Sequence, residues 1–291
     1  MKHIIDSRLL TNKVKVALVG CGGVGSSLYS GLAKLHTALI AIGHPEGLEV
    51  TAYDPDTVTE GNCGRQMFAR QDIGVNKAVV LTHRLNQYFS TGWTAKPCRF
   101  PEANSVGYST VPDIIISCVD TKASRRDIAA YCAKNRVRYW LDTGNSLSDG
   151  QIILGQPGFG KRLSKAEKAK QSQPILPTVT DLYPSILDAS IPEDNNAPSC
   201  SLAEALESQD LFIGATIATF AAQLLWSLFR QGGLDHHGYF VNLKAGRVNP
   251  LAIDEEGWKR FIPKKSRVRK ITAKKEKVGK PPKYVSSMLI M

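Results

Sequence analysis

Polar residues of complementary chemistry are concentrated in the stretch YDPDTVTEGNCGRQ, residues 53–66. Asp54 follows an apolar run, and Asn62, Arg65 and Gln66 come shortly after it. A carboxylate at the end of a strand can accept hydrogen bonds from ribose hydroxyls, as in dinucleotide-binding domains. The arginine and the two amides have no evident use in a nicotinamide site, so they indicate a ligand with more negative charge.

Two further residues extend this set. Lys77 stands before a segment with helical spacing, and Asp120 follows an apolar run in SCVDTKASRRDI. A triphosphate needs cationic partners, and the Mg²⁺ that accompanies it needs oxygen ligands such as a carboxylate. Arg65 and Lys77 supply the cations and Asp120 the carboxylate, so the pattern favours ATP with Mg²⁺ over NAD.

A glycine-rich loop precedes all of these residues, in VALVGCGGVGSS at 16–27. Gly20, Gly22 and Gly25 fit G-x-G-x-x-G between a predicted strand and a predicted helix, the pattern of a phosphate-binding turn. Asp54 lies 29 residues after Gly25, further than the usual spacing of about 20. The loop predicts a mononucleotide or dinucleotide site with an insertion before its acidic residue.

The elements that must position these residues alternate along the chain. Apolar runs predict strands, and segments with 3.6-residue spacing predict helices. Strands are expected at 14–19, 48–53, 113–119, 138–141 and 151–154, and helices at 26–39, 77–89 and 124–135. This alternation predicts an α/β fold with a Rossmann-like, mostly parallel sheet and helices on both faces. A hairpin expected at 239–253 would add a C-terminal antiparallel extension.

Composition divides the chain into four segments. We expect a Rossmann-like ATP-binding part at 1–155 and an irregular crossover, rich in proline and basic residues, at 156–199. Residues 200–255 should complete the same domain with a buried helix and the hairpin. Residues 256–291 form a basic tail, predicted to be disordered.

The formal net charge of +11 belongs to that tail. Residues 259–283 hold 12 Lys or Arg and one acid, so the rest of the chain is neutral. Such a segment suits nucleic acid or an acidic partner protein, and equally a solvated tail that aids solubility. The six cysteines form no CxxC pair, so no zinc site is expected and a reducing cytoplasm is the simplest location.

One segment raises the question of a membrane. Residues 211–229, LFIGATIATFAAQLLWSLF, carry no charge over nineteen residues, a length that just spans a bilayer. The segment also contains hydroxyl side chains and Gln223. We expect a helix buried in the core or in a homodimer interface, and no membrane.

The ordered motifs resemble those of a known family. GCGGVGS, DPDTVxxxNxxRQ, GVNK and CVDTKASR follow one another over residues 16–126, as in ThiF/MoeB-type, ubiquitin-activating-enzyme-like adenylyltransferases. The words HPEGLEVTAYDPDTV, DIGVNKAVVL and APSCSLAEALESQDLF look most like the ThiF-family proteins of bacterial PRTRC systems. The resemblance extends to about residue 255 and leaves out the tail.

This resemblance implies ATP-dependent adenylation of the C-terminal carboxylate of a ubiquitin-like or sulfur-carrier protein. By motif position, Asp120 would hold Mg²⁺ and Asp54 the ribose. The remaining matched residues would bind and polarise the phosphates: Gly20, Gly22, Gly23, Gly25, Asn62, Arg65, Gln66 and Lys77. The chain departs from the family at Thr121, where an asparagine is frequent, and Arg8 only loosely matches the arginine that reaches a partner subunit's ATP.

Cys200 is the candidate for a later thioester step, which some members of the family perform. It directly precedes SLAE, a capping-box pattern that opens a helix, and a thiol at a helix N-terminus is more acidic and more nucleophilic. A small buried apolar residue is the competing interpretation. Arg65, Lys77, Asp120 and Cys200 are therefore the predicted catalytic residues. A non-catalytic ATP-binding scaffold with a nucleic-acid-binding tail and an NAD-dependent oxidoreductase are the alternative functions.

Overall fold

The computed structural model describes residues 1–102, 111–157, 173–191 and 202–261. Within these ranges, eight strands form a sheet in the order β10-β9-β7-β6-β5-β2-β3-β4. The strands from β6 to β4 pair in parallel, and β7, β9 and β10 pair antiparallel. Their bounds are β2 (Val14–Val19), β3 (Leu48–Tyr53), β4 (Thr94–Lys96), β5 (Ile114–Ser117), β6 (Tyr139–Asn145), β7 (Asp149–Gly155), β9 (His236–Asn242) and β10 (Arg247–Ala252). The predicted mostly parallel sheet with an antiparallel C-terminal extension is confirmed.

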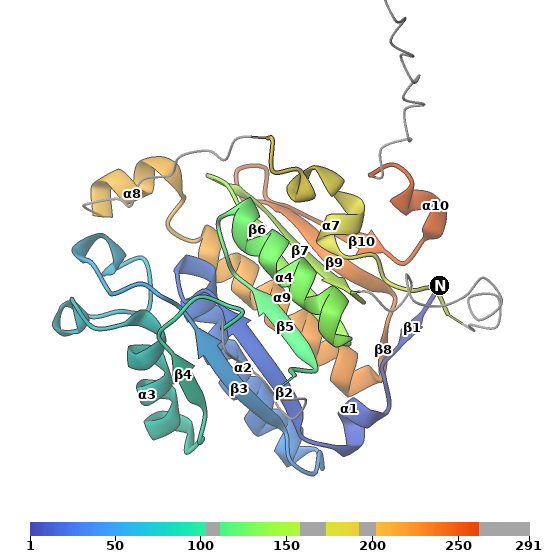
Figure 1. The fold of residues 1–291 in the computed structure, drawn as a ribbon, viewed down its shortest axis with the longest axis horizontal. Helices are drawn as coiled ribbons and strands as arrows, with labels where there is room; N and C mark the ends of the chain where they lie inside the picture. Colours follow the sequence, from blue (N-terminus) through green and yellow to red (C-terminus); the bar gives the residue numbers. More distant parts are fainter. Residues whose placement is uncertain (103–110, 158–172, 192–201, 262–291) are drawn as a thin grey trace, which may run out of the picture.

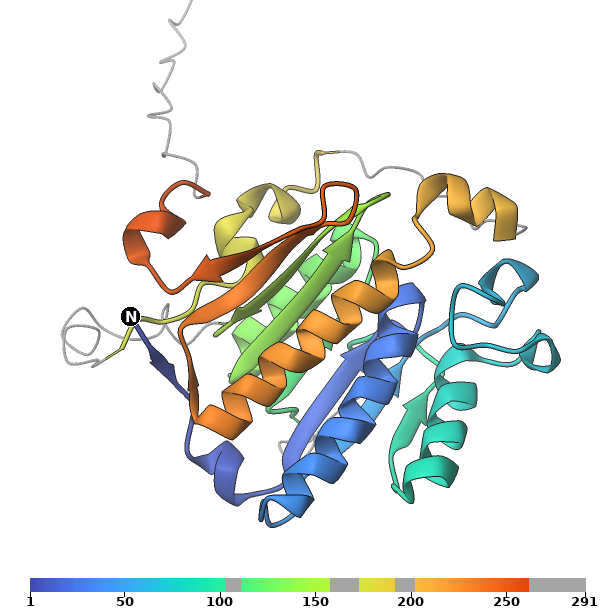
Figure 2. The same cartoon turned by 180° about the vertical axis from the view of Figure 1, so that it is seen from behind.

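Helices cover both faces of this sheet (Figures 1 and 2). α2 (Gly23–Ala41) and α9 (Ile213–Gln231) lie side by side on one face, and α4 (Lys122–Asn135) lies on the other. α3 (Lys77–Phe89) packs beside β3 and β4. Parallel strands covered on both sides must be apolar along their whole length, and all four residues of β5 are buried.

Small residues allow α2 and α9 to approach closely. A methyl group on Gly31 of α2 would lie 3.1 Å from the Cβ of Ala222 of α9. A methyl group on Gly214 of α9 would lie 3.0 Å from the carbonyl group of Gly23. α9 is long and apolar enough to cross a membrane by length and composition, but in this fold its buried side chains pack against α2 and the sheet. The expected core helix is therefore present in the structure.

Shorter elements complete the described chain. They are β1 (His3–Ile4), which pairs with β8 (Gly233–Leu234), then α1 (Arg8–Thr11), η1 (Glu60–Asn62), η2 (Arg70–Asp72), α7 (Val179–Leu182), η4 (Pro184–Leu187), α8 (Leu202–Ser208) and α10 (Glu255–Trp258). The strands β1, β4 and β8 were not expected from the sequence. α7 and η4 fall inside the segment expected to be irregular, and the basic tail beyond residue 261 lies outside the described residues.

Candidate functional site

The carboxyl ends of three parallel strands meet at one edge of the sheet. Val19 of β2 is in register with Tyr53 of β3 and with Ser117 of β5. The glycine loop, the Asp54 stretch and the Asp120 segment each leave the sheet within three residues of these positions. Parallel pairing therefore brings together three motifs that are far apart in the sequence, as ligand sites in α/β sheets require.

The first turn after β2 can be made only by glycine. Gly20 has φ of +91°, and a methyl group there would lie 2.5 Å from the carbonyl oxygen of Cys118. A methyl group on Gly25 would lie 1.9 Å from the carbonyl oxygen of Gly20, so the loop packs directly on α2. This geometry fits the first and third glycines of a phosphate-binding loop, which allow a tight turn and close packing of helix on strand.

Gly22 differs from Gly20 and Gly25 because open space, and not a packed neighbour, lies beside it. It is the N-cap residue of α2, and apart from its chain neighbours no heavy atom of the described residues lies within 4 Å of where its Cβ would be. The free N–H groups of the first helical turn need acceptors, and a phosphate bound beside Gly22 would provide them. The space at Gly22 therefore fits the predicted phosphate.

Arg65 lies over this first turn of α2. A methyl group on Gly23 would lie 3.2 Å from Nη1 of Arg65. Nη1 donates a hydrogen bond of 2.5 Å to Oε1 of Gln209, while the buried Nε has no partner among the described residues. No carboxylate in the described part of the chain pairs with Arg65, and burial lowers the pKa of its guanidinium. A half-buried cation without a counter-charge, placed on a helix N-terminus, is suited to an anionic ligand.

Asp54 and Lys77 lie next to this turn. The carboxylate of Asp54 accepts hydrogen bonds from the backbone N–H of Cys21 at 2.6 Å and of Asp56 at 2.8 Å. Burial raises the pKa of Asp54, and these two bonds and nearby Lys77 oppose that rise. Lys77 is buried and donates to the exposed carboxylate of Asp56 at 3.2 Å. Two oxygens that each accept one bond retain capacity for ribose hydroxyls.

The amide residues of the motif are positioned differently from each other. Oδ1 of Asn62 accepts a hydrogen bond of 2.9 Å from the backbone N–H of Thr59 and so caps the N-terminus of the short helix η1. Oε1 of Gln66 is buried and has no hydrogen-bond partner among the described residues. Buried polar atoms in native proteins are normally paired, so Gln66 has an acceptor free for a ligand or a water molecule, whereas Asn62 is engaged in local structure.

Asp120 stands at the same edge, directly after β5. Its side chain is exposed, and no partner for it occurs in the described ranges. The next residue, Thr121, accepts a bond of 3.1 Å from the backbone N–H of Ser124 and caps α4. The departure at Thr121 thus serves to begin a helix. Within the described residues, no group of three or more His, Cys, Asp or Glu side chains could hold a metal ion by itself.

Cys200 lies outside the described residues, so its thioester role stays a prediction. Burial raises the pKa of Cys21, and it raises the pKa of Cys118 to about 12. It also raises the pKa of Cys132. Thiols held protonated in this way are poor nucleophiles, so these three cysteines fit a structural role.

A buried polar network, which was not expected from the sequence, supports this edge of the sheet from beneath. Nε of Arg125 donates to Oδ1 of Asp142 at 3.0 Å, and Oγ of Ser117 donates to the same oxygen at 2.6 Å. Nε1 of Trp140 donates to Oγ of Ser117 at 2.7 Å. These bonds tie the start of α4 to β5 and β6, and therefore fix the backbone on either side of Asp120. Gln209 was also not predicted, because 144 positions separate it from Arg65.

Similarity to known proteins defines the class of this protein. Residues 6–255 match the ThiF family, and the chain belongs to that family. Over 200 residues it is 28% identical to the NEDD8-activating enzyme E1 catalytic subunit of Dictyostelium discoideum. That alignment covers 67% of this chain and 40% of the relative, so the chain spans about two fifths of that protein.

Solved structures share the fold at low sequence identity. E. coli MccB with ATP is similar at a TM-score of 0.51 and 16% identity, covering 84% of this chain and 64% of that one. PaaA is similar at a TM-score of 0.51 and 14% identity, covering 82% of this chain and 64% of that one. These likenesses agree with the α/β architecture and its antiparallel end.

Proposed function

We propose that this protein is an ATP-dependent adenylyltransferase that activates the C-terminal carboxylate of a ubiquitin-like protein, a sulfur carrier or a peptide. The observation that carries the proposal is Arg65, a half-buried guanidinium with no carboxylate partner in the described chain, set over the glycine loop. A structural arginine in such a place would need a counter-charge. A nucleotide phosphate supplies one, and membership of the ThiF family supports this ligand.

Different residues of the site would bind different parts of ATP. The backbone at Gly22 and the guanidinium of Arg65 would bind phosphate oxygens. Lys77, next to Asp54, would add a second cation, and Asp54 would accept bonds from the ribose. The unpaired oxygen of Gln66 would accept a hydrogen bond from a hydroxyl or amino group of the nucleotide or from a water molecule. Positioning and charge neutralisation account for most of the catalysis in phosphoryl transfer, so this arrangement requires no covalent catalyst for the first step.

Mg²⁺ would complete the charge balance on the phosphates. The exposed carboxylate of Asp120 lies at the same edge of the sheet as the glycine loop and has no partner in the described ranges. It would therefore provide a protein ligand for Mg²⁺. Mg²⁺ commonly takes only one or two carboxylates and fills its other positions with water and phosphate. A single aspartate therefore fits this metal, which neutralises charge on the leaving pyrophosphate when it is bound.

The reaction is in-line substitution at the α-phosphorus of ATP. An oxygen of the acceptor carboxylate forms a bond to that phosphorus, the bond to the bridging oxygen breaks, and pyrophosphate leaves with the electron pair. The product is a mixed acyl-phosphate anhydride. The name of the Dictyostelium relative includes NEDD8, and MccB is described with MccA. These names support a protein or peptide as the acceptor whose carboxylate is adenylated.

Exchange of labelled pyrophosphate into ATP tests the proposal. Exchange should appear when the purified protein, Mg²⁺ and the cognate acceptor are combined, and it should disappear when the acceptor lacks its terminal residue. No exchange with any small ubiquitin-like protein encoded near this chain would contradict the proposal. If Arg65→Ala and Asp120→Ala kept the cellular role intact, a non-catalytic ATP-binding scaffold would be the better description. Binding of NAD without binding of ATP would indicate an oxidoreductase.

A thioester at Cys200 is a separate proposal. It rests on the position of Cys200 in the sequence, two residues before the start of α8. The conjugate with the acceptor should be sensitive to reductant in the native protein and should become a hydroxylamine-sensitive ester in Cys200→Ser. A thioester that persists in Cys200→Ala would exclude this cysteine.

The branch of the family, the cellular location, the oligomeric state and the role of the tail are also proposed from the sequence. The motif words support the PRTRC branch of the family, and the cysteine pattern supports a cytoplasmic location. A homodimer and a tail at 259–283 that contacts nucleic acid or an acidic protein complete the proposal. Light scattering and salt-dependent DNA binding of the full chain, compared with a chain ending at residue 258, would test the last two points.

A further inference from the structure

We propose that Gln209 is a positioning residue for ATP binding, which holds Arg65 over the phosphate loop without neutralising its charge. This inference rests on the proposed function and names a residue that determines how the site recognises phosphate. The observation behind it is the hydrogen bond of 2.5 Å from Nη1 of Arg65 to Oε1 of Gln209.

Three groups meet at this point of the site. A methyl group on Gly23 would lie 3.2 Å from Nη1 of Arg65 and 3.8 Å from Oε1 of Gln209. The guanidinium and the amide are therefore both against the first turn of α2. Arginine has five N–H donors, and the bond to Gln209 uses one of them. The other terminal N–H donors form no hydrogen bond among the described residues, so Arg65 can contact Gln209 and a phosphate at the same time.

The segment that carries Gln209 is itself fixed. The backbone N–H of Asp210 donates to the carbonyl of Leu147, in the loop between β6 and β7, at 2.8 Å. On the other side, a methyl group on Gly64 would lie 3.3 Å from Cδ2 of Leu202, so α8 lies against the loop that contains Arg65. The amide of Gln209 thus reaches Arg65 from a well-supported position.

The charge of the residue at 209 distinguishes positioning from simple structural pairing. A glutamate would offer the same oxygen and would form a stronger, charge-assisted bond to Arg65. It would also cancel the positive charge that a phosphate needs and would place a negative charge beside the phosphate loop. A neutral amide fixes the guanidinium and leaves its full charge for the ligand. A merely structural role would favour glutamate, and a role in ATP binding would favour glutamine.

The test compares Gln209→Glu and Gln209→Ala in the full-length protein. Calorimetric titration with ATP and Mg²⁺ should show affinity weakened about tenfold by Gln209→Glu, because a charge-assisted contact is lost. Gln209→Ala should weaken it by about threefold, since Arg65 keeps its charge but loses its support. Binding of adenosine, followed by ligand-observed NMR, should be the same in all three proteins because adenosine has no phosphate.

The matched control is Gln223→Glu. Gln223 is exposed on α9 and donates to Ser227 at 3.2 Å, so this variant adds the same charge away from the loop and should bind ATP like the wild type. The melting temperature of Gln209→Glu should equal or exceed that of the wild type. ATP affinity unchanged in Gln209→Glu, or equal losses for ATP and adenosine, would overturn the inference while the proposed function stands. A wild-type protein that binds no ATP would overturn both.

Discussion

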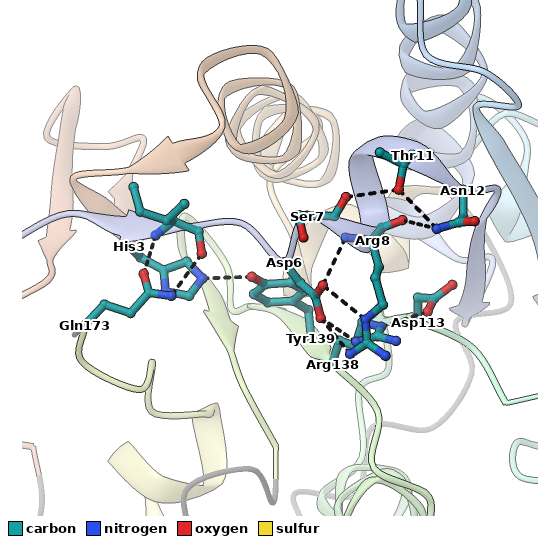
Figure 3. A network of polar contacts seen from close by, with 11 residues as sticks. His3, Asp6, Ser7, Arg8, Thr11, Asn12, Asp113, Arg138, Tyr139 and Gln173 are labelled. Carbon is teal, nitrogen blue, oxygen red and sulfur yellow. Dashed lines mark hydrogen bonds and ion pairs between the residues drawn. The ribbon is translucent and has the colours of Figure 1, made fainter. Parts of the chain in front are cut away.

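The two ends of the parallel strands hold arginines in opposite electrostatic environments. At the amino ends, Arg138 donates to Asp113 at 3.0 Å and also pairs with Asp6, and Arg8 pairs with Asp6 at 3.1 Å. Figure 3 shows the guanidinium groups of Arg8 and Arg138 both facing the carboxylate of Asp6. At the carboxyl ends, Arg65 has only a neutral amide as its partner in the described chain. The arginines at the amino ends are paired with carboxylates, whereas Arg65 at the carboxyl ends is not, although Arg125 and Asp142 form a buried pair beneath that edge.

This difference separates residues that hold the fold from residues that await a ligand. A paired arginine has already satisfied its charge, so removing it affects mainly stability. An unpaired, half-buried arginine costs free energy in the unliganded fold and gains a partner when an anion binds. Arg8 belongs to the matched group and lies at the end of β2 away from the glycine loop, so its donation across a dimer stays a hypothesis.

The largest expected effect is on the buried matched pair. Replacing Asp142 by alanine leaves Arg125 buried without its carboxylate, and should lower the free energy of unfolding by about 3–5 kcal/mol. Urea denaturation followed by circular dichroism measures this loss. A loss below about 1 kcal/mol would mean that this pair contributes no more than an exposed ion pair. It would weaken the contrast between arginines that stabilise the fold and Arg65.

The unmatched arginine should behave in the opposite way. Arg65→Ala should weaken ATP binding by about 10- to 100-fold, the equivalent of a hydrogen bond to a charged group. The melting temperature should stay the same or rise, because a cation that burial disfavours is removed. Arg70→Ala is the matched control, since Arg70 is exposed in η2 nearby. A clear fall in the melting temperature of Arg65→Ala would mean that Arg65 is structural.

Acidification should destabilise the fold through His237. This side chain is fully buried, its Nδ1 pairs with the carbonyl of Leu154 at 2.7 Å, and burial lowers its pKa from 6.5 to about 4. Between these two values the unfolded chain binds the proton and the folded chain does not, so stability present at pH 7 is lost as the pH falls. From pH 7 to pH 5 the loss from this residue should be about 2 kcal/mol.

The contribution of His237 to the pH dependence of stability is obtained by comparing the wild type with a variant that lacks this side chain. His3, whose pKa burial lowers to about 4, acts in the same direction. Buried Asp54 and Asp142, with raised pKa values, act against it. Urea denaturation of the wild type and of His237→Gln at both pH values should show a smaller pH dependence in the variant. Equal dependence in the two proteins would contradict the assignment.

The smallest effect is expected at the partly exposed matched cluster. Arg138→Ala should cost about 1 kcal/mol or less, because ion pairs in contact with solvent contribute little. It should leave the affinity for ATP unchanged, since Arg138 precedes β6 at the end of the sheet opposite to the glycine loop. A loss of ATP affinity in Arg138→Ala would blur the distinction between the two ends.

The parallel half of the fold followed from local sequence patterns. The strands predicted at 14–19 and 48–53 and the helix at 77–89 have the bounds of β2, β3 and α3. Continuous apolar runs and regular helical spacing fix these elements with little help from distant residues. β4 and the β1–β8 pair were not predicted, because strands of two or three residues depend on a neighbouring strand rather than on their own sequence.

The candidate site was predicted only where one motif held the information. Gly20, Gly25 and Arg65 could be assigned from spacing, because the turn, the packing and the cation are local properties. Gln209 and Asp142 could not, since their roles exist only through contacts with residues far away in the sequence. Cys200 and most of the basic tail lie outside the described residues, and their roles stay predictions.

The close approach of α2 and α9 has an electrostatic consequence. Gly23 meets Gly214, and eight positions further along each helix Gly31 meets Ala222. Equal steps in the same direction mean that the helices run parallel, with their N-termini side by side. Each N-terminus carries about half a positive charge from its aligned peptide dipoles, so the pair presents about one. An anion at the glycine loop would therefore face the positive ends of two helices and would relieve the repulsion between them.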